Sequence, residues 1–218
     1  MGNNVMKKVF IKPLNRLIEI AERLIEISID NPLIFRELTF NMYDNLIVSV
    51  DNVEIDLSKY GHILYNSYDL SLTDKKVVNA LYSMISKNIS NCYANEILSI
   101  ENKFINILDD VFYNIPIPFQ YENEIDISKL LACFGVKYPT VEKGKYIEQL
   151  SLYFKIFSEV CHIKCFVSIN LVNMLTSEEI ILLKDTLKAL DVVLIDCYIN
   201  NNDNHQNTLI IDSDWCSI

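Results

Sequence analysis

The sequence predicts an α/β protein with a mostly parallel sheet and an inserted helical segment. Near the C-terminus, the apolar run KCFVSI is followed by a capped helix and then by a second apolar run, VVLIDCY. A strand, helix, strand unit of this kind places its two strands parallel in one sheet. After Thr73, apolar residues recur at helical spacing for roughly forty positions without proline or glycine. We read this run as two long helices or one broken helix.

The N-terminal part contains one ambiguous segment. Residues 14–29 carry apolar residues at helical spacing, whereas LIEI and LIEISI within them also alternate with the period of a strand. The pattern alone leaves a helix and a pair of strands open. A helix is predicted after Pro32, with Asp30 or Asn31 at its start. A hairpin is predicted where IVSV and VEID flank the dipeptide that begins at Asp51.

The second half alternates helices and strands. Asp126 is placed to cap a short helix that ends at Gly135. An amphipathic helix is predicted over residues 143–162. Thr176 and Glu179 have the spacing of a capping box, in which each side chain binds the other residue's backbone N–H. A last strand, TLIID, completes the expected order of elements.

The order of elements also predicts the domain organisation. No internal repeat or low-complexity linker separates two domains, so a second domain has to be an insertion. We expect residues 1–72 and 126–218 to form the α/β body and residues 73–125 to form the inserted helical part. The helical run closes at Pro116, because proline interrupts helix hydrogen bonding.

The composition predicts a soluble protein of the cytoplasm. A chain of 218 residues with 50% hydrophobic residues can bury a substantial core. Its longest uncharged apolar runs are shorter than the roughly 20 residues of a membrane-spanning helix, and no apolar signal-peptide region follows the start. The six cysteines are scattered, mostly in apolar runs, which is typical of reduced thiols. The net charge of −10 disfavours nucleic acid unless basic residues gather locally.

The loop at residues 170–175 follows a predicted strand, where ligands bind in open α/β sheets, yet no catalytic motif accompanies it. None of the four glycines belongs to a phosphate-binding loop. Asp196, at the end of VVLID, resembles the acidic residue that holds magnesium in phosphate-loop enzymes, but the loop and its lysine are absent. Ser168 lies inside a strand, and the three histidines stand in unrelated contexts. We therefore predict no enzyme activity.

An acidic group follows the helical run. Glu122, Glu124 and Asp126 carry hard oxygen ligands of the kind that calcium and magnesium prefer. Their spacing is not that of an EF-hand, and a solvated acidic surface is the simpler interpretation. They are nevertheless the best candidate metal ligands, because they lie where the chain returns from the helical insertion.

The basic residues form small groups along the chain. For each lysine, an ordinary solvated side chain is the simpler interpretation. Because arginines are few, contacts with phosphates would dominate over base reading if DNA is bound. The candidate DNA-binding residues are Lys7, Lys8, Lys75, Lys76, Lys137, Lys143, Lys145 and Lys164.

The ordered series EIDISKLLACFGVKYP, FKIFSEVCH, IKCFVSIN, TSEEIILLKDTLKAL, DVVLID and IIDSDW resembles the CRISPR-associated Csn-two family. Members of that family are small ring-forming proteins of type II-A CRISPR loci. They are involved in acquiring new spacers. Asn170 and Asp196 fall on the asparagine and the acidic residue that end two family strands. The family's closing segment is matched by Asp212, Asp214 and Trp215. Upstream, FIKPLNRLIEI and ERLIEISIDNPLIFRELTFNMY resemble its opening strands and helix, which favours strands over residues 14–29.

The resemblance implies an α/β head that is related to phosphate-loop ATPases but lacks their loop, with an inserted helical leg. Four subunits would form a ring whose lysine-lined channel holds double-stranded DNA by its ends. Calcium would bind near the hinge between head and leg. Relatives have a hinge of the LENELDLEYDE kind, whereas this chain has YNIPIPFQYENE, with fewer carboxylates.

Together with the absence of a catalytic motif, the resemblance implies a non-catalytic ring that binds linear double-stranded DNA and acts in spacer acquisition with the CRISPR integrase and the guide-RNA nuclease. An alternative is a metal-dependent phosphoesterase or degenerate nucleotidase that uses Asp196 with Asp212 and Asp214. A third possibility is an adaptor that does not contact DNA.

Overall fold

The computed structural model describes residues 7–20, 22–50, 53–115, 117–118, 120–122, 124–139, 146–199 and 208–211. The chain divides into two compact units. The larger unit combines Met1–Ser71 with Val141–Ile218, and the smaller unit is Leu72–Thr140. The smaller unit therefore also takes in residues 126–140, which the sequence analysis assigns to the body.

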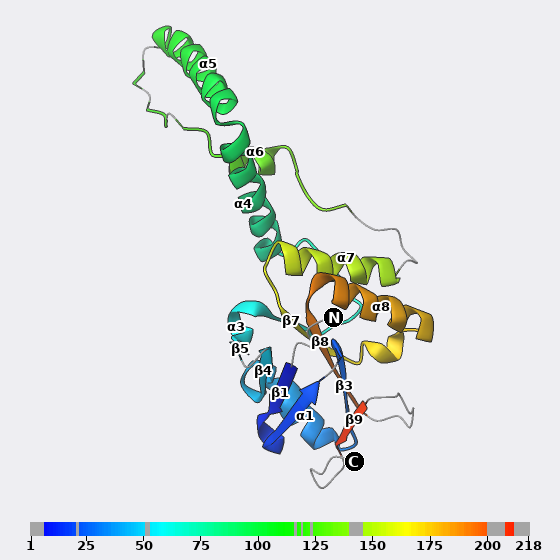
Figure 1. Cartoon of the computed structure of the whole chain (residues 1–218). Helices are drawn as coiled ribbons and strands as arrows, with labels where there is room; N and C mark the ends of the chain where they lie inside the picture. Colours follow the sequence, from blue (N-terminus) through cyan, green and yellow to red (C-terminus); the bar gives the residue numbers. More distant parts are fainter. Residues whose placement is uncertain are drawn as a thin grey trace. The chain divides into compact units, whose positions relative to one another are not determined.

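The larger unit contains the β-sheets (Figure 1). Its strands are β1 Lys7–Ile11, β2 Arg16–Ile20, β3 Leu24–Ile29, β4 Leu46–Val50, β5 Val53–Ile55, β6 Gly61–Leu64, β7 Cys165–Ile169, β8 Val193–Ile199 and β9 Thr208–Ile211. Its helices are α1 Pro32–Phe40, α2 Met42–Asn45, α3 Leu57–Tyr60, α7 Tyr146–Glu159 and α8 Ser177–Leu190, with 3-10 turns η1 Lys12–Leu14 and η2 Val172–Met174.

Two sheets form the body. The five-stranded sheet has the order β6-β7-β8-β3-β9, and each of its neighbouring pairs is parallel. The four-stranded sheet has the order β2-β1-β4-β5 and is antiparallel. The predicted mixed α/β class with a parallel sheet is confirmed, and so is the β7-α8-β8 unit. The predicted hairpin is confirmed by the β4–β5 pairing, although residues 51 and 52 lie outside the described residues.

The ambiguous segment at residues 14–29 forms strands β2 and β3, as the resemblance favours. All six residues of β3 are buried, because this strand lies inside the parallel sheet between β8 and β9. A strand that is covered on both faces reads as a nearly continuous apolar run. Such a run contains apolar residues at helical as well as alternating positions. Periodicity alone therefore could not decide between a helix and a pair of strands.

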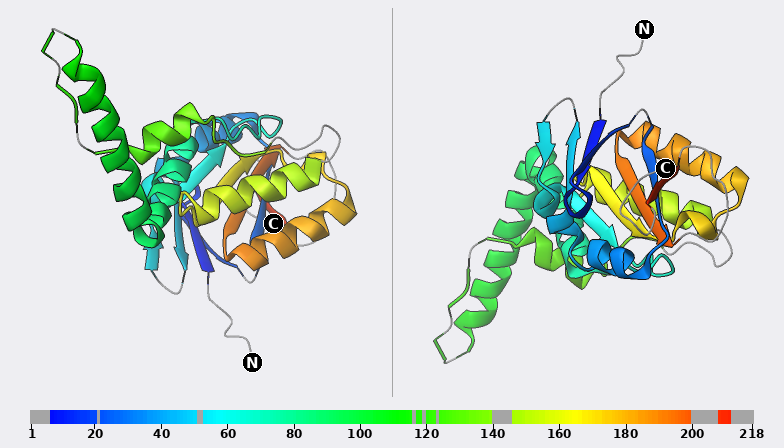
Figure 2. Two further views of the ribbon diagram at one scale, coloured as in Figure 1. Left: turned by 90° about the horizontal axis from the view of Figure 1, so that it is seen from above. Right: turned by 90° about the horizontal axis from the view of Figure 1, so that it is seen from below.

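Alternate residues of the parallel sheet face two different layers. Ile27, Val167 and Ile195 pack in one core with the antiparallel sheet and α1. The opposite face is covered by α7 and α8 (Figure 2), where the rings of Phe154 and Phe166 lie 4.6 Å apart. Each fully buried side chain of this size contributes about 1.5 to 3 kcal/mol. Apolar burial on both faces thus holds the sheet in place.

Local signals set the helix ends. The Asn31 side chain accepts a hydrogen bond from the Leu33 N–H at 2.8 Å, with Pro32 as the first residue of α1. The predicted capping box of α8 is present, since Thr176 and Glu179 bind each other's backbone N–H groups. Helix α7 ends at Glu159, before the predicted residue 162, and the chain turns into β7.

The smaller unit contains α4 Lys75–Cys92, α5 Ala94–Tyr113 and α6 Ile127–Cys133. The prediction of two long helices or one broken helix is confirmed, because the helical run is divided at Tyr93 into α4 and α5. Asp126 caps α6 by accepting from the Lys129 N–H, and Gly135 ends it in the left-handed region at φ 63°. Among the described residues, no helix combines the length and the apolar composition that crossing a bilayer requires.

We predict that Thr176→Ala lowers the free energy of unfolding by about 1 kcal/mol, because the first turn of α8 loses the acceptor for the Glu179 N–H. Equilibrium unfolding in urea measures this change. Thr176→Ser is the matched control and should retain most of the stability, because it keeps the hydroxyl. An alanine variant as stable as the parent would show that the capping box does not stabilise the helix.

Candidate functional site

The buried carboxylate of Asp196 closes the loop that follows β7. Asp196 lies on β8 and is fully buried. Its Oδ1 accepts hydrogen bonds from the Ser168 hydroxyl at 2.6 Å and from the Leu171 N–H at 3.0 Å. Its Oδ2 accepts from the Val172 N–H at 2.8 Å. The loop that the sequence singles out therefore directs its first backbone donors into the protein.

Strand register and one left-handed residue produce this arrangement. Ser168 and Asp196 are register partners on the parallel strands β7 and β8. Asn170 then adopts φ 59°, a conformation that asparagine tolerates better than most residues. Its side chain accepts a hydrogen bond from Asn173 at 2.7 Å. The chain thus turns back over the sheet edge, and the next two N–H groups face Asp196.

The electrostatics of the site follow from its burial. Burial raises the pKa of Asp196, whereas the hydrogen bonds from Ser168, Val172 and Leu171 favour the ionised form and oppose this rise. Burial also raises the pKa of Tyr146 to about 12, so this phenol stays neutral near pH 7. The Tyr146 hydroxyl donates to the Ser67 carbonyl at 2.7 Å. The site is therefore a buried acid held among neutral donors.

This geometry limits what Asp196 can do chemically. A general acid or base has to come within hydrogen-bond reach of the proton that it transfers. Asp196 has no exposed surface, and three groups of the protein occupy its oxygens. The sequence-based enzyme alternative also names Asp212 and Asp214, which lie outside the described residues, as does Trp215.

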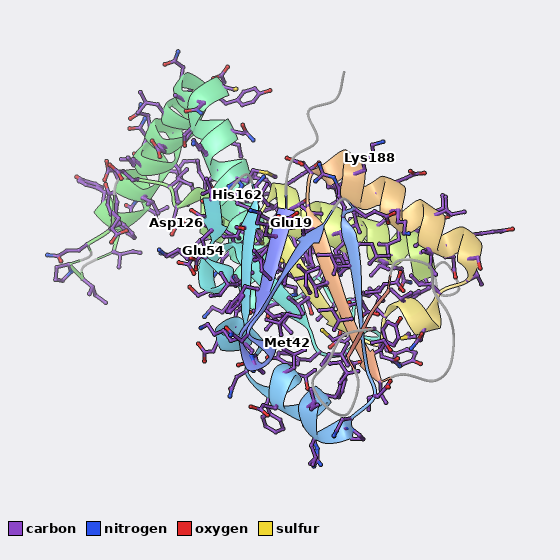
Figure 3. The ribbon with its side chains drawn as sticks, turned by 60° about the horizontal axis from the view of Figure 1, so that its bottom comes forward. Glu19, Met42, Glu54, Asp126, His162 and Lys188 are labelled. Carbon is purple, nitrogen blue, oxygen red and sulfur yellow. The ribbon has the colours of Figure 1, made fainter. Side chains whose placement is uncertain are left out.

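The predicted metal ligands do not form a common site. Asp126 (Figure 3) caps α6, and both of its oxygens face Lys129, at 3.1 Å from the backbone nitrogen and 3.4 Å from Nζ. The backbone hydrogen bond from Lys129 lowers the pKa of Asp126. Glu122 and Glu124 are exposed. Within the described ranges, no three His, Cys, Asp or Glu residues gather as a metal site, so calcium binding stays a prediction.

The predicted DNA-binding lysines of the larger unit are dispersed. Lys8 lies on β1 of the antiparallel sheet, half-buried, with its Nζ 3.8 Å from a Glu19 carboxylate oxygen. Lys164 is exposed where the chain enters β7, at the opposite end of that strand from the Asp196 loop. The side chain of Lys7 lies outside the described residues, as do Lys143 and Lys145.

The smaller unit carries three predicted lysines on or beside the first half of α4. Lys75 and Lys76 are exposed in its first turn. The Tyr82 hydroxyl donates to the Val136 carbonyl at 3.1 Å, which places the exposed Lys137 about two turns along the same helix. No ion pair among the described residues engages any of these three lysines. They form a local group of free positive charge.

Sequence reasoning missed an exposed apolar stripe on α5. One face of this helix contacts the returning chain, since Glu101 accepts from the Ile125 N–H at 2.9 Å and Phe112 lies against Tyr121. An adjacent face of the helix is left exposed, although its signal was present in the sequence as apolar residues at alternating spacings of three and four residues. We define the α5 stripe as Ile97, Ile100, Phe104, Ile107 and Val111, of which the last four are 47 to 56% exposed.

Comparison with known proteins gives one informative match. The family described as "CRISPR-associated protein (Cas_Csn2)" matches residues 42–215, and this is the family that the order of elements resembles. No curated protein matches the chain. Among solved structures, a bacterial Atm1-family ABC exporter with ATP bound aligns with 99% of this chain and 38% of its own, at 11% identity and a TM-score of 0.37. The chain thus spans well under half of that exporter, and so weak a likeness carries no argument.

We predict that Asp196→Asn lowers the free energy of unfolding by about 3 kcal/mol, because an amide NH2 group replaces one of the two oxygens that accept from these three donors and then faces a donor instead. Ser168→Ala removes only one of these donors and should cost about 1 kcal/mol. Chemical denaturation measures both values. Equal stability of Asp196→Asn and the parent protein would contradict the structural role assigned to this carboxylate.

Proposed function

Because this chain belongs to the CRISPR-associated Cas_Csn2 family, we propose that it is a non-catalytic protein of spacer acquisition that assembles into a ring and binds double-stranded DNA. The larger unit would be the head, of the phosphate-loop ATPase type without its loop, and the smaller unit the leg. Four copies would enclose a channel that takes linear DNA by its ends. The CRISPR integrase and the guide-RNA nuclease are the proposed partners.

The family match carries the CRISPR role, and the Asp196 site supports the absence of catalysis. In open α/β sheets, ligands bind in the crevice outside the carboxyl ends of the strands. At this position, the backbone N–H groups of Leu171 and Val172 bind a carboxylate of the protein itself. Donors engaged in this way do not face a phosphate. This supports a scaffold role for the sheet.

The lysines of the smaller unit support DNA binding. The N-terminus of a helix carries partial positive charge, so Lys75 and Lys76 in the first turn of α4 destabilise that helix slightly. A polyanion in contact with them would remove this repulsion. Because the chain has a net charge of −10, such local groups are needed to attract phosphate at all.

The α5 stripe supports self-association. Its residues follow the alternating spacing of three and four that lets two helices pack side by side. The stripe extends about 21 Å along the helix, at about 1.5 Å per residue. Contiguous apolar surface of this kind marks an interaction site on a protein. A second copy is the proposed occupant, since its own α5 presents the same stripe.

We predict that the pair Phe104→Glu and Ile107→Glu weakens self-association about 100-fold or more, because assembly would bury unpaired charge. Analytical ultracentrifugation over a concentration series measures this effect. Asn102→Glu with Asn106→Glu adds the same charge to exposed polar positions of α5 and should leave assembly intact. Unchanged assembly of the stripe variant would exclude α5 as an interface.

We also predict that replacing Lys75, Lys76 and Lys137 by alanine reduces the slope of log affinity against log salt by about 3, because each lysine that contacts a phosphate contributes about 1. Fluorescence anisotropy with labelled linear duplex over a salt series gives the slope. The matched control replaces Lys59, Lys155 and Lys188, which are exposed on the larger unit. Equal slopes for both triple variants would remove the smaller-unit lysines from the DNA interface.

A further inference from the structure

Two buried carboxyl groups stand side by side on the parallel sheet. Glu26 on β3 and Asp196 on β8 are register partners, and Asp196 is in turn the partner of Ser168 on β7. Partners on neighbouring parallel strands point their side chains to the same face, and neighbouring strands lie about 4.8 Å apart. A row of polar side chains therefore crosses a face that otherwise packs apolar residues against α7 and α8.

Both acids are removed from water. The exposed fraction is 5% for Glu26 and 0% for Asp196. Two carboxylates within about 4 to 6 Å of each other in a buried site repel strongly, so that one of them retains its proton to an unusually high pH. Because Glu26 and Asp196 are buried neighbours on adjacent strands, the pair is not expected to carry two negative charges at neutral pH.

The hydrogen bonds to Asp196 indicate that its carboxyl group is the ionised member of the pair. Asp196 accepts from one hydroxyl and two backbone N–H groups, an arrangement that stabilises a carboxylate. We propose that Glu26 and Asp196 together form a buried proton-binding site that holds one proton at neutral pH, mainly on Glu26. This site lies directly beneath the loop at residues 170–175. The proposal does not depend on DNA binding or on ring formation.

The buried hydroxyl of Ser28 also supports the proposed proton-binding site. Ser28 lies two residues beyond Glu26 on β3, hence on the same face of the sheet, and it is 2% exposed. Among the described residues, its hydroxyl has no hydrogen-bond partner. An unsatisfied buried hydroxyl is costly. It offers a donor to the pair when the shared proton leaves.

The other titratable groups around the pair come from several elements. The phenol of Tyr146 on α7 interacts electrostatically with Asp196, and Glu179 on α8 acts on the same phenol. On β8, Tyr198 lies on the same face of the sheet as Asp196, and Cys197 lies on the opposite face. The negative charge of Asp196 adds to the burial that raises the pKa of Cys197. Strand β9, with the sequence TLII, has no titratable side chain. The raised pKa values of the Tyr146 phenol and the Cys197 thiol keep both groups neutral near pH 7.

The shared proton links folding to pH in a defined direction. In the unfolded chain, Asp and Glu lose their protons near pH 3.9 and 4.3. The folded pair keeps one proton to higher pH, so the folded state binds more protons than the unfolded state above about pH 4.3. The contribution of the pair to stability is therefore fully present below this range and is lost as the pH rises toward the point at which the pair gives up its proton.

The test is urea unfolding of the wild type, Glu26→Gln and Glu37→Gln between pH 5 and 8.5. Glutamine at position 26 keeps the size of the side chain and cannot ionise. We expect the unfolding constant of the wild type to rise by up to about tenfold per pH unit, and Glu26→Gln to remove this dependence. Glu37 is exposed on α1, and its variant should keep the slope of the wild type.

A second measurement uses the unmodified protein, in case Glu26→Gln does not fold. Carboxyl carbon NMR at pH 7 should show one protonated carboxyl group, assigned to Glu26, and an ionised Asp196. Two ionised signals at pH 7, or the same pH slope in the wild type and Glu26→Gln, would overturn the proposal. Added calcium or magnesium that stabilises the wild type but not Glu26→Gln would also overturn it, because a metal ion would then occupy the place of the proton.

Discussion

The hydrogen bonds that surround the Asp196 carboxylate connect the sheet, the loop after β7 and the start of α8. A carboxylate without exposed surface is costly unless donors surround it. The donors come from Ser168 on the neighbouring strand and from the backbone of Leu171 and Val172. These two backbone groups fix the turn at η2 that leads into the capping box of α8. The bonds that make a buried charge tolerable thus also determine the course of the chain between two parallel strands.

The place where an α/β sheet would bind a ligand is therefore filled by the protein's own backbone. Exposed surfaces are therefore the candidate binding sites of this protein. The smaller unit offers two surfaces of different chemistry, the exposed α5 stripe and the lysines near the start of α4. Apolar surface suits contact between protein copies, whereas uncompensated positive charge suits phosphate. Both agree with the role proposed for a member of the Cas_Csn2 family.

Features that depend on residues close together in the sequence could be predicted, whereas features that depend on contacts between distant residues could not. The capping box at Thr176 and the N-cap at Asp126 depend on residues three positions apart, so both were predicted correctly. Glu26 could not be recognised as buried, because its register with Asp196 joins strands from opposite ends of the chain. The α5 stripe was visible as apolar spacing, but only the structure shows that the returning chain contacts Glu101 and Phe112 and leaves the stripe exposed.

The most direct test of the proposed function compares two forms of one DNA sequence. The purified protein would be titrated against linear and covalently closed circular duplexes over a series of salt concentrations, with binding followed by gel mobility. A ring that is threaded from an end should capture the linear form alone, with affinity that decreases as salt rises. Equal binding of both forms would indicate an open surface instead of a channel, and no binding to either form would contradict the DNA-binding role itself.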